Sequence, residues 1–214
     1  MNPMEIIEEA AITRYPSPVL NFFPTLTNEE KIDAIADSFR KILETLELDL
    51  SNPSLAETPR RIAKMYVEEL FSGLAPGKFP QVCDLENSFI KPPEGIVLIE
   101  EIAIRSICEH HFVPFIGKAK VAYIPQKKIL GLSKINRIVH YFCKRPQLQE
   151  RLTAQIADSL SILLDSQDIA VAIEAEHFCV TMRGVRDESS RTYTHVLRGQ
   201  FQDNDRYQNR FFDK

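Results

Sequence analysis

Hydrophobic residues recur at helical spacing in two segments of the first ninety residues. The first segment begins at Thr27-Asn28-Glu29-Glu30, which has the T-x-x-E form of a capping box. Its apolar positions repeat every three or four residues: Ile32, Ile35, Ala36, Phe39, Ile42, Leu43 and Leu46. The second segment begins at Thr58-Pro59, a capping residue followed by proline at the first helical position, and continues to about Gly73. The pattern predicts an N-terminal helical region, followed by a proline-containing connector over 75–93.

The rest of the chain alternates between strand and helix patterns. The predicted order is two strands (96–106 and 118–124, with a turn at 113–117), two helices (from Ser133 as cap to about Lys144, and 148–164) and two strands (169–179 and 191–201). This order predicts an α+β fold, with an antiparallel sheet and the two helices on one face. We therefore expect a helical region and connector over 1–93 and an α+β catalytic domain over 94–214.

Composition narrows the functional classes. The 214 residues are 44% hydrophobic and 26% charged, with a net charge of −4, which argues against a nucleic-acid-binding face. The most apolar stretch, 96–104, contains Glu100 and Glu101, so we expect no membrane span. The acidic start resembles no targeting signal, and four cysteines do not suggest a secreted disulfide framework. The expected location is the cytoplasm.

The densest chemical signal is Cys108-Glu109-His110-His111. Cys108 and His111 have Cys-x2-His spacing, and Cys179 follows much later, two residues after His177 on the same predicted strand face. Thiolate and imidazole donors suit Zn²⁺. The spacing leaves two kinds of metal site open: a catalytic site with three protein ligands and water, or a closed Cys2His2 site that adds His110 or His177. Cysteines that serve only as small buried hydrophobes are the alternative, and we interpret Cys83 and Cys143 in that way.

Basic residues gather in three places. Ser133 lies at a predicted helix start, and Lys134 and Arg137 follow it. This arrangement favours the binding of a phosphate group. Arg183 follows Cys179 closely, and Arg61 and Lys64 lie one turn apart on the second N-terminal helix. Near Gln149, the carboxylate of Glu150 could accept two hydrogen bonds from the N1–H and 2-amino edge of guanine. An ordinary cap and solvated charged faces are the alternative at each of these places.

Five segments, in consistent order over roughly residues 28–202, resemble the GTP cyclohydrolase I family. They are Glu57–Tyr66, Cys108–Phe112, Gly131–Arg137, Arg145–Leu152 and His177–Arg186. The resemblance implies a zinc-dependent hydrolase that converts GTP and water to 7,8-dihydroneopterin triphosphate and formate, the first step of tetrahydrofolate or pterin synthesis. It also implies the tunnelling fold (T-fold) and a toroidal homodecamer with active sites at subunit interfaces.

The resemblance also implies roles for individual residues. Cys108, His111 and Cys179 match the zinc ligands, His110 matches the histidine that transfers protons at N7 and C8, and His177 matches an assisting histidine. The triphosphate and ribose side is matched by Ser133, Lys134, Arg137 and Arg183, and by Arg61 and Lys64 from a neighbouring subunit. Gln149 and Glu150 match the guanine-recognition residues, and Leu132 matches the pocket wall.

Two other functions compete with this one. A T-fold reductase of nitriles, with a cysteine nucleophile and a nicotinamide cofactor, leaves the Cys108-x2-His111 pair beside His110 unexplained. A non-catalytic module would have structural zinc and regulatory nucleotide binding. The last strand departs from the Ser- and Thr-rich pattern of the family at Arg191, Tyr193, His195 and Arg198. The sequence assigns no role to residues 1–25 or 203–214, and it does not choose among the downstream pathways.

Overall fold

The computed structural model describes residues 17–19, 26–75, 77–81, 84–86 and 95–213, with the backbone alone for 84–86. The elements in chain order are α2 (Asn28–Thr45), α3 (Thr58–Lys64), η1 (Met65–Leu70), η2 (Ser72–Leu74), β1 (Asp84–Glu86), β2 (Val97–Cys108), β3 (Pro114–Tyr123), β4 (Lys128–Leu130), α4 (Leu132–Cys143), β5 (Pro146–Gln147), α5 (Gln149–Leu164), β6 (Ile169–His177), α6 (Phe178–Thr181), β7 (Thr192–Leu197), α7 (Gln200–Asp203) and α8 (Asp205–Phe212).

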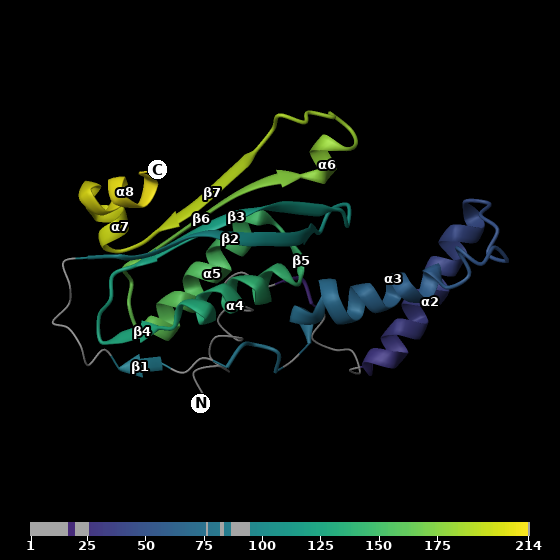
Figure 1. The fold of residues 1–214 in the computed structure, drawn as a ribbon, viewed down its shortest axis with the longest axis horizontal. Helices are drawn as coiled ribbons and strands as arrows, with labels where there is room; N and C mark the ends of the chain where they lie inside the picture. Colours follow the sequence, from purple (N-terminus) through teal and green to yellow (C-terminus); the bar gives the residue numbers. More distant parts are fainter. Residues whose placement is uncertain (1–16, 20–25, 76, 82–83, 87–94, 214) are drawn as a thin grey trace.

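A five-stranded sheet in the order β5-β2-β3-β6-β7 forms the centre of the molecule (Figure 1). The four long strands are antiparallel, and β5 adds a short parallel pairing at the end of β2. The register of β2 against β3 shifts between Ile99 and Ile102, where Glu101 has a φ of 61°. The α+β class and the antiparallel sheet predicted from the sequence are confirmed, and the small β1–β4 pair adds to them.

The main core lies between this sheet and the helices α4 and α5. Alternate residues of the strands point into it, including Ile104, Phe115 and Val121, and they meet Ile135 and Phe142 of α4. α5 is buried along almost its whole length, and its buried residues include polar ones. Buried polar groups need hydrogen-bond partners, so α5 is tied to its surroundings by specific contacts as well as by apolar packing.

Two short C-terminal helices cover part of the opposite sheet face. Phe201 of α7 and Phe211 of α8 pack against Ala122 and Ala170 of the sheet in a second apolar cluster. The sequence predicted helices on one face only, so this second layer is an addition. A four-residue and an eight-residue helix are too short for a clear helical period, which explains why the apolar spacing did not predict them.

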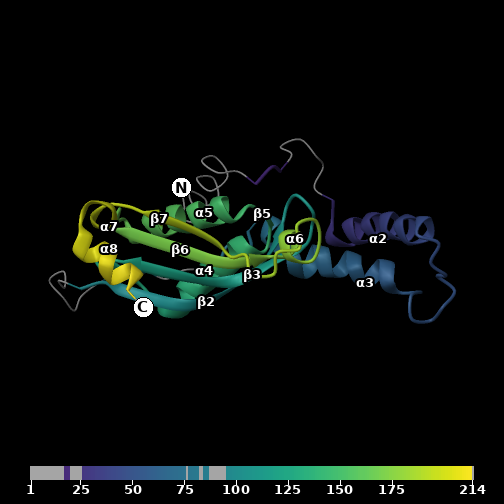
Figure 2. The same cartoon turned by 90° about the horizontal axis from the view of Figure 1, so that it is seen from above.

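The N-terminal helices extend beyond the end of the sheet opposite to α7 and α8 (Figures 1 and 2). Ile32 and Ala36 of α2 pack on Ala63 of α3, and Arg60 pairs with Glu29 and Asp33. The predicted capping box of Thr27 and Glu30 is confirmed. The second helix is α-helical only to Lys64 and continues as a π-helical turn.

Three local predictions were wrong. The turn between the first two strands lies at 109–113, because 114–117 belong to β3. Gly131, with no side-chain cap, precedes α4, so Ser133 lies within the first turn of the helix. β6 ends at His177 and Cys179 lies on α6, so strand parity does not explain why these two residues are close.

Candidate metal and nucleotide site

The first part of the site is the turn that follows Cys108. The Cys108 N–H donates to Val113 O at 2.9 Å, and the Phe112 N–H donates to Cys108 O at 2.9 Å. Phe112 has a φ of 54°, in the left-handed region that a residue with a Cβ rarely adopts. Its ring packs edge-on against Tyr66 and Phe71, so the N-terminal region holds this turn through aromatic contacts.

A second anchor ties the turn to α5. The Glu109 N–H donates to Gln147 O at 3.0 Å, and its carboxylate pairs with Arg151. Arg151 also donates to Gln147 Oε1 at 3.1 Å and to Pro146 O at 3.2 Å. Neither Glu109 nor Arg151 was assigned a role from the sequence, because the contact joins residues of opposite charge that lie far apart in the chain.

Donor atoms of three residues gather where β2 and β6 end. Single ligand atoms of Cys108, His177 and Cys179 all lie within 4.8 Å of one another. Cys108 is buried, and the other two are half-buried. Two thiols and an imidazole form a donor set that suits Zn²⁺, and a separation of this size lets one ion contact all three. The residues therefore fit a zinc site.

The pKa shifts at this site follow from burial and charge. Burial raises the pKa of the Cys179 thiol, and the neighbouring Cys108 adds to the rise. Burial lowers the pKa of His177, while the negative charge of Glu150 opposes that shift. A neutral imidazole is the form that binds metal, and a bound divalent cation would favour the thiolates strongly.

His110 and His111 are both exposed in the turn. The Nδ1 atom of His110 lies 4.0 Å from Cys108 Sγ, and its ring lines a cavity of about 390 Å³ with Glu109 and Phe112. His111 is outside the three-donor group. The structure therefore brings together two of the three predicted ligands, Cys108 and Cys179, and adds His177. The ligand role of His111 stays a prediction.

His177 is held on two sides. Its ring stacks on Phe115 with a centroid distance of 4.7 Å and an interplanar angle of 7°. Its Nε2 atom lies 2.7 Å from Gln149 Oε1. Gln149 is buried, whereas Glu150 beside it is exposed at the start of α5. The two predicted guanine-recognition residues thus have different surroundings.

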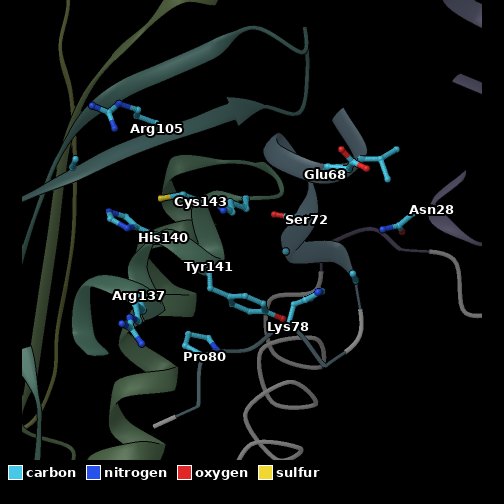
Figure 3. A pocket seen from close by; sticks show the side chains of 15 residues that line it. Asn28, Glu68, Ser72, Lys78, Pro80, Arg105, Arg137, His140, Tyr141 and Cys143 are labelled. Carbon is cyan, nitrogen blue, oxygen red and sulfur yellow. The ribbon is translucent and has the colours of Figure 1, made fainter. Parts of the chain in front are cut away.

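A cationic cavity of about 770 Å³ lies beside α4 and the edge of β2. Figure 3 shows Arg105, His140 and Arg137 along one side of it, with Lys78 across from them beside Tyr141. Lys144 and Glu68 also line the cavity. Four Lys and Arg residues thus line the cavity: Lys78, Arg105, Arg137 and Lys144. None of them forms an ion pair within the described part of the chain. Arg137 was predicted from the sequence, whereas Arg105, Lys78 and His140 were not, because they are distant in the chain and carry no motif.

The other predicted anion-binding residues are dispersed in the single chain. The Lys134 ammonium donates to Gln81 O at 2.8 Å, and Leu132 and Ser133 are exposed. The charge of Arg183 acts on Cys179, which places this guanidinium near the three-donor group. Arg61 and Lys64 are exposed on α3 and line neither of the two cavities.

The fold and the donors together define an α+β protein with a Cys–His–Cys group that could hold a metal ion, and known proteins similar to the chain give its family. The GTP cyclohydrolase I family model matches residues 35–214. Similar curated proteins include the GTP cyclohydrolase 1 of Vibrio vulnificus (strain YJ016), 53% identical over 178 residues, which are 83% of this chain and 81% of that protein. That of Aeromonas salmonicida (strain A449) is 52% identical over 176 residues, 82% of this chain and 80% of that protein. The chain belongs to the GTP cyclohydrolase I family.

None of the helices among the described residues combines the length and the apolar character that crossing a bilayer requires.

Proposed function

We propose that this chain is a zinc-dependent enzyme that hydrolyses GTP to 7,8-dihydroneopterin triphosphate and formate. The observation that carries the proposal is the convergence of the Cys108, His177 and Cys179 donor atoms beside the exposed imidazole of His110. Membership of the family, over most of the chain, supports the same reaction.

Cys108 and Cys179 would hold the zinc ion, together with His111 as the resemblance implies or with His177, whose donor atom lies within the group. When bound, the ion acts as a Lewis acid that prepares water for attack on an electrophilic carbon such as C8 of the purine. The pairing of two soft thiolates with imidazole supports zinc over a harder, oxygen-preferring cation.

His110 would transfer protons at N7 and C8 while the imidazole ring of the base opens. Its ring is exposed in the turn, next to the donor group but outside it, which suits a group that must exchange protons with the substrate and with water. His177, whose donor atom lies within the group, would assist. Replacing His110 is expected to stop turnover while metal and GTP still bind.

Basic residues would recognise the triphosphate of the substrate, and an acidic residue would recognise its guanine base. Arg183 and the residues of α4, Ser133, Lys134 and Arg137, would bind the triphosphate, and Glu150 would accept hydrogen bonds from the guanine edge, with Gln149 and Leu132 in the same pocket. The exposed carboxylate of Glu150, whose charge acts on His177, supports that placement.

We also propose that the working enzyme is a homo-oligomer, a toroidal decamer, in which a neighbouring copy supplies Arg61 and Lys64. Among the described residues, β7 pairs only with β6, and β2 has β5 beside it only at its last two residues. Long unpaired sheet edges favour pairing with a further strand, which supports assembly through them.

The test incubates the purified protein with GTP and zinc and measures formate and, after oxidation, a fluorescent pterin. We expect both products from the wild type, and neither from His110→Ala with zinc content and GTP binding retained. Absence of both products from a zinc-loaded wild type would overturn the proposal and favour a non-catalytic nucleotide-binding role. Tyr193→Phe, on the solvent side of β7, is the matched control and is expected to keep its activity.

A further inference from the structure

We infer that Gln149 is a positioning residue that fixes the ring orientation and tautomer of His177, and that it does not contact guanine. The inference deepens the proposed function, because His177 lies in the proposed active site. It reassigns one of the two residues that the family resemblance places at the guanine base.

The orientation of the Gln149 amide is determined by its surroundings. Its Nε2 lies 3.0 Å from Ile173 O, 3.0 Å from Thr192 O and 3.1 Å from Thr194 Oγ1. Two of these partners are backbone carbonyls, which can only accept a hydrogen bond. The amide nitrogen must therefore face them, and the amide oxygen must face His177.

The hydroxyl of Thr194 agrees with this orientation. The Thr153 hydroxyl lies 2.8 Å from Gln149 O, a carbonyl that only accepts, so Thr153 donates there. The Thr194 hydroxyl, 2.7 Å from Thr153 Oγ1, must then donate to Thr153. Because the Thr194 hydroxyl donates its hydrogen to Thr153, its oxygen can accept a hydrogen bond from the Gln149 amide nitrogen. Every hydrogen bond in this network then joins one donor to one acceptor.

The tautomer of His177 follows from the same rule. Gln149 Oε1 is an acceptor only, and it lies 2.7 Å from His177 Nε2. Nε2 therefore carries the hydrogen, and in the neutral ring Nδ1 keeps its lone pair. The parallel stack on Phe115 fixes the plane of the ring. Gln149 thus selects the nitrogen that His177 offers for metal binding or proton transfer.

Guanine recognition by the same amide would require hydrogen-bonding groups that are already in use. The two hydrogens on Nε2 are donated to three acceptors, and Oε1 accepts from His177. The residue is also only 1% exposed. A ligand edge cannot reach the amide without breaking these bonds. The exposed carboxylate of Glu150 is left as the side chain of this pair that meets the base.

The kinetic test compares Gln149→Met with Glu150→Gln. Gln149→Met keeps the length of the side chain but removes its hydrogen bonds, and we expect kcat for GTP to fall by about 10–100-fold with KM nearly unchanged, as for other residues that orient a site histidine. Glu150→Gln should instead raise KM and weaken the preference for GTP over ITP, which lacks the 2-amino group. Tyr193→Phe is the control on the neighbouring strand position. A Gln149→Met protein with normal kcat, raised KM and reduced GTP-over-ITP preference would overturn the inference.

A second readout does not depend on activity. Neutron diffraction from crystals of the wild-type holoenzyme, exchanged into heavy water, is expected to show deuterium on His177 Nε2, between the ring and Gln149. Deuterium on Nδ1 with a bare Nε2 would overturn the inference even if GTP turnover is normal. If the wild type produces no formate, the proposed function fails, whereas the position of the deuterium still decides the role of Gln149. The same measurement decides it if Gln149→Met does not fold.

Discussion

Glu109 and Arg151 form an ion pair in which the side chains are 19% and 12% exposed, and this pair connects the Cys108 turn to the start of α5. Arg151→Met would leave a largely buried carboxylate without its cation, which costs about 3 kcal/mol in such pairs. We expect a lower thermal midpoint and weaker zinc retention, because the turn carries Cys108. Thermal unfolding and zinc content after dialysis against a chelator measure the two effects.

The double variant Glu109→Gln/Arg151→Met separates charge from packing. Removing both charges avoids an isolated buried carboxylate, so the double variant should recover part of the loss seen in Arg151→Met. Equal losses in the two variants would mean that the ion pair itself is not what holds the turn.

Arg198 forms a second buried ion pair, with Asp158 of α5. Its Nη2 atom lies 2.5 Å from Asp158 Oδ1. Asp158 is only 2% exposed, so Arg198→Met removes the cation beside a buried carboxylate and should destabilise the protein by about 3–5 kcal/mol. Arg191→Met, whose partner Glu176 lies 3.3 Å away and is more exposed, is the control and should change stability by less than about 1 kcal/mol. Denaturant unfolding compares the two, and similar losses would contradict the burial argument.

The sequence predicted what depends on local spacing and missed what depends on contacts between distant segments. Apolar periodicity placed the long strands and helices, and the Cys108 motif with Cys179 predicted a shared donor site. Arg198 departs visibly from the family pattern, but its partner Asp158 could not be predicted, because a buried ion pair has no fixed spacing in the sequence. For the same reason Gln149 was assigned by resemblance alone, since four of its side-chain partners, Ile173, His177, Thr192 and Thr194, are on β6 and β7.

Cys143 provides a pH-dependent prediction. Burial raises the pKa of its thiol to about 12, from an ordinary value of 9.0. Between these pH values the unfolded chain loses the thiol proton and the folded chain keeps it. The contribution of this thiol to stability is therefore constant well below pH 9 and falls as the pH rises above it, by up to about 1.4 kcal/mol per pH unit. Wild type should therefore lose more stability between pH 9 and 10.5 than Cys143→Ser, which has no titrating group there. Parallel loss in both proteins, measured by denaturant unfolding, would show that other groups dominate.

The cavity beside α4 gives a prediction about the nucleotide triphosphate. Arg105 and Arg137 line one side of it and have no ion-pair partner within the described residues. An anionic ligand can therefore pair with both guanidinium groups without breaking an existing ion pair. If the triphosphate binds there, Arg105→Ala should raise KM for GTP about five-fold, the size expected for an exposed charge contact of about 1 kcal/mol. The effect should shrink as the salt concentration rises, because screening weakens exposed charge pairs.

Lys118→Ala is the matched control, since Lys118 is an exposed cation of the same sheet but is paired with Glu101 and lies outside the cavity. Steady-state kinetics at low and high salt measure the difference between the two variants. An equal KM for both at low salt would place the triphosphate outside the reach of Arg105.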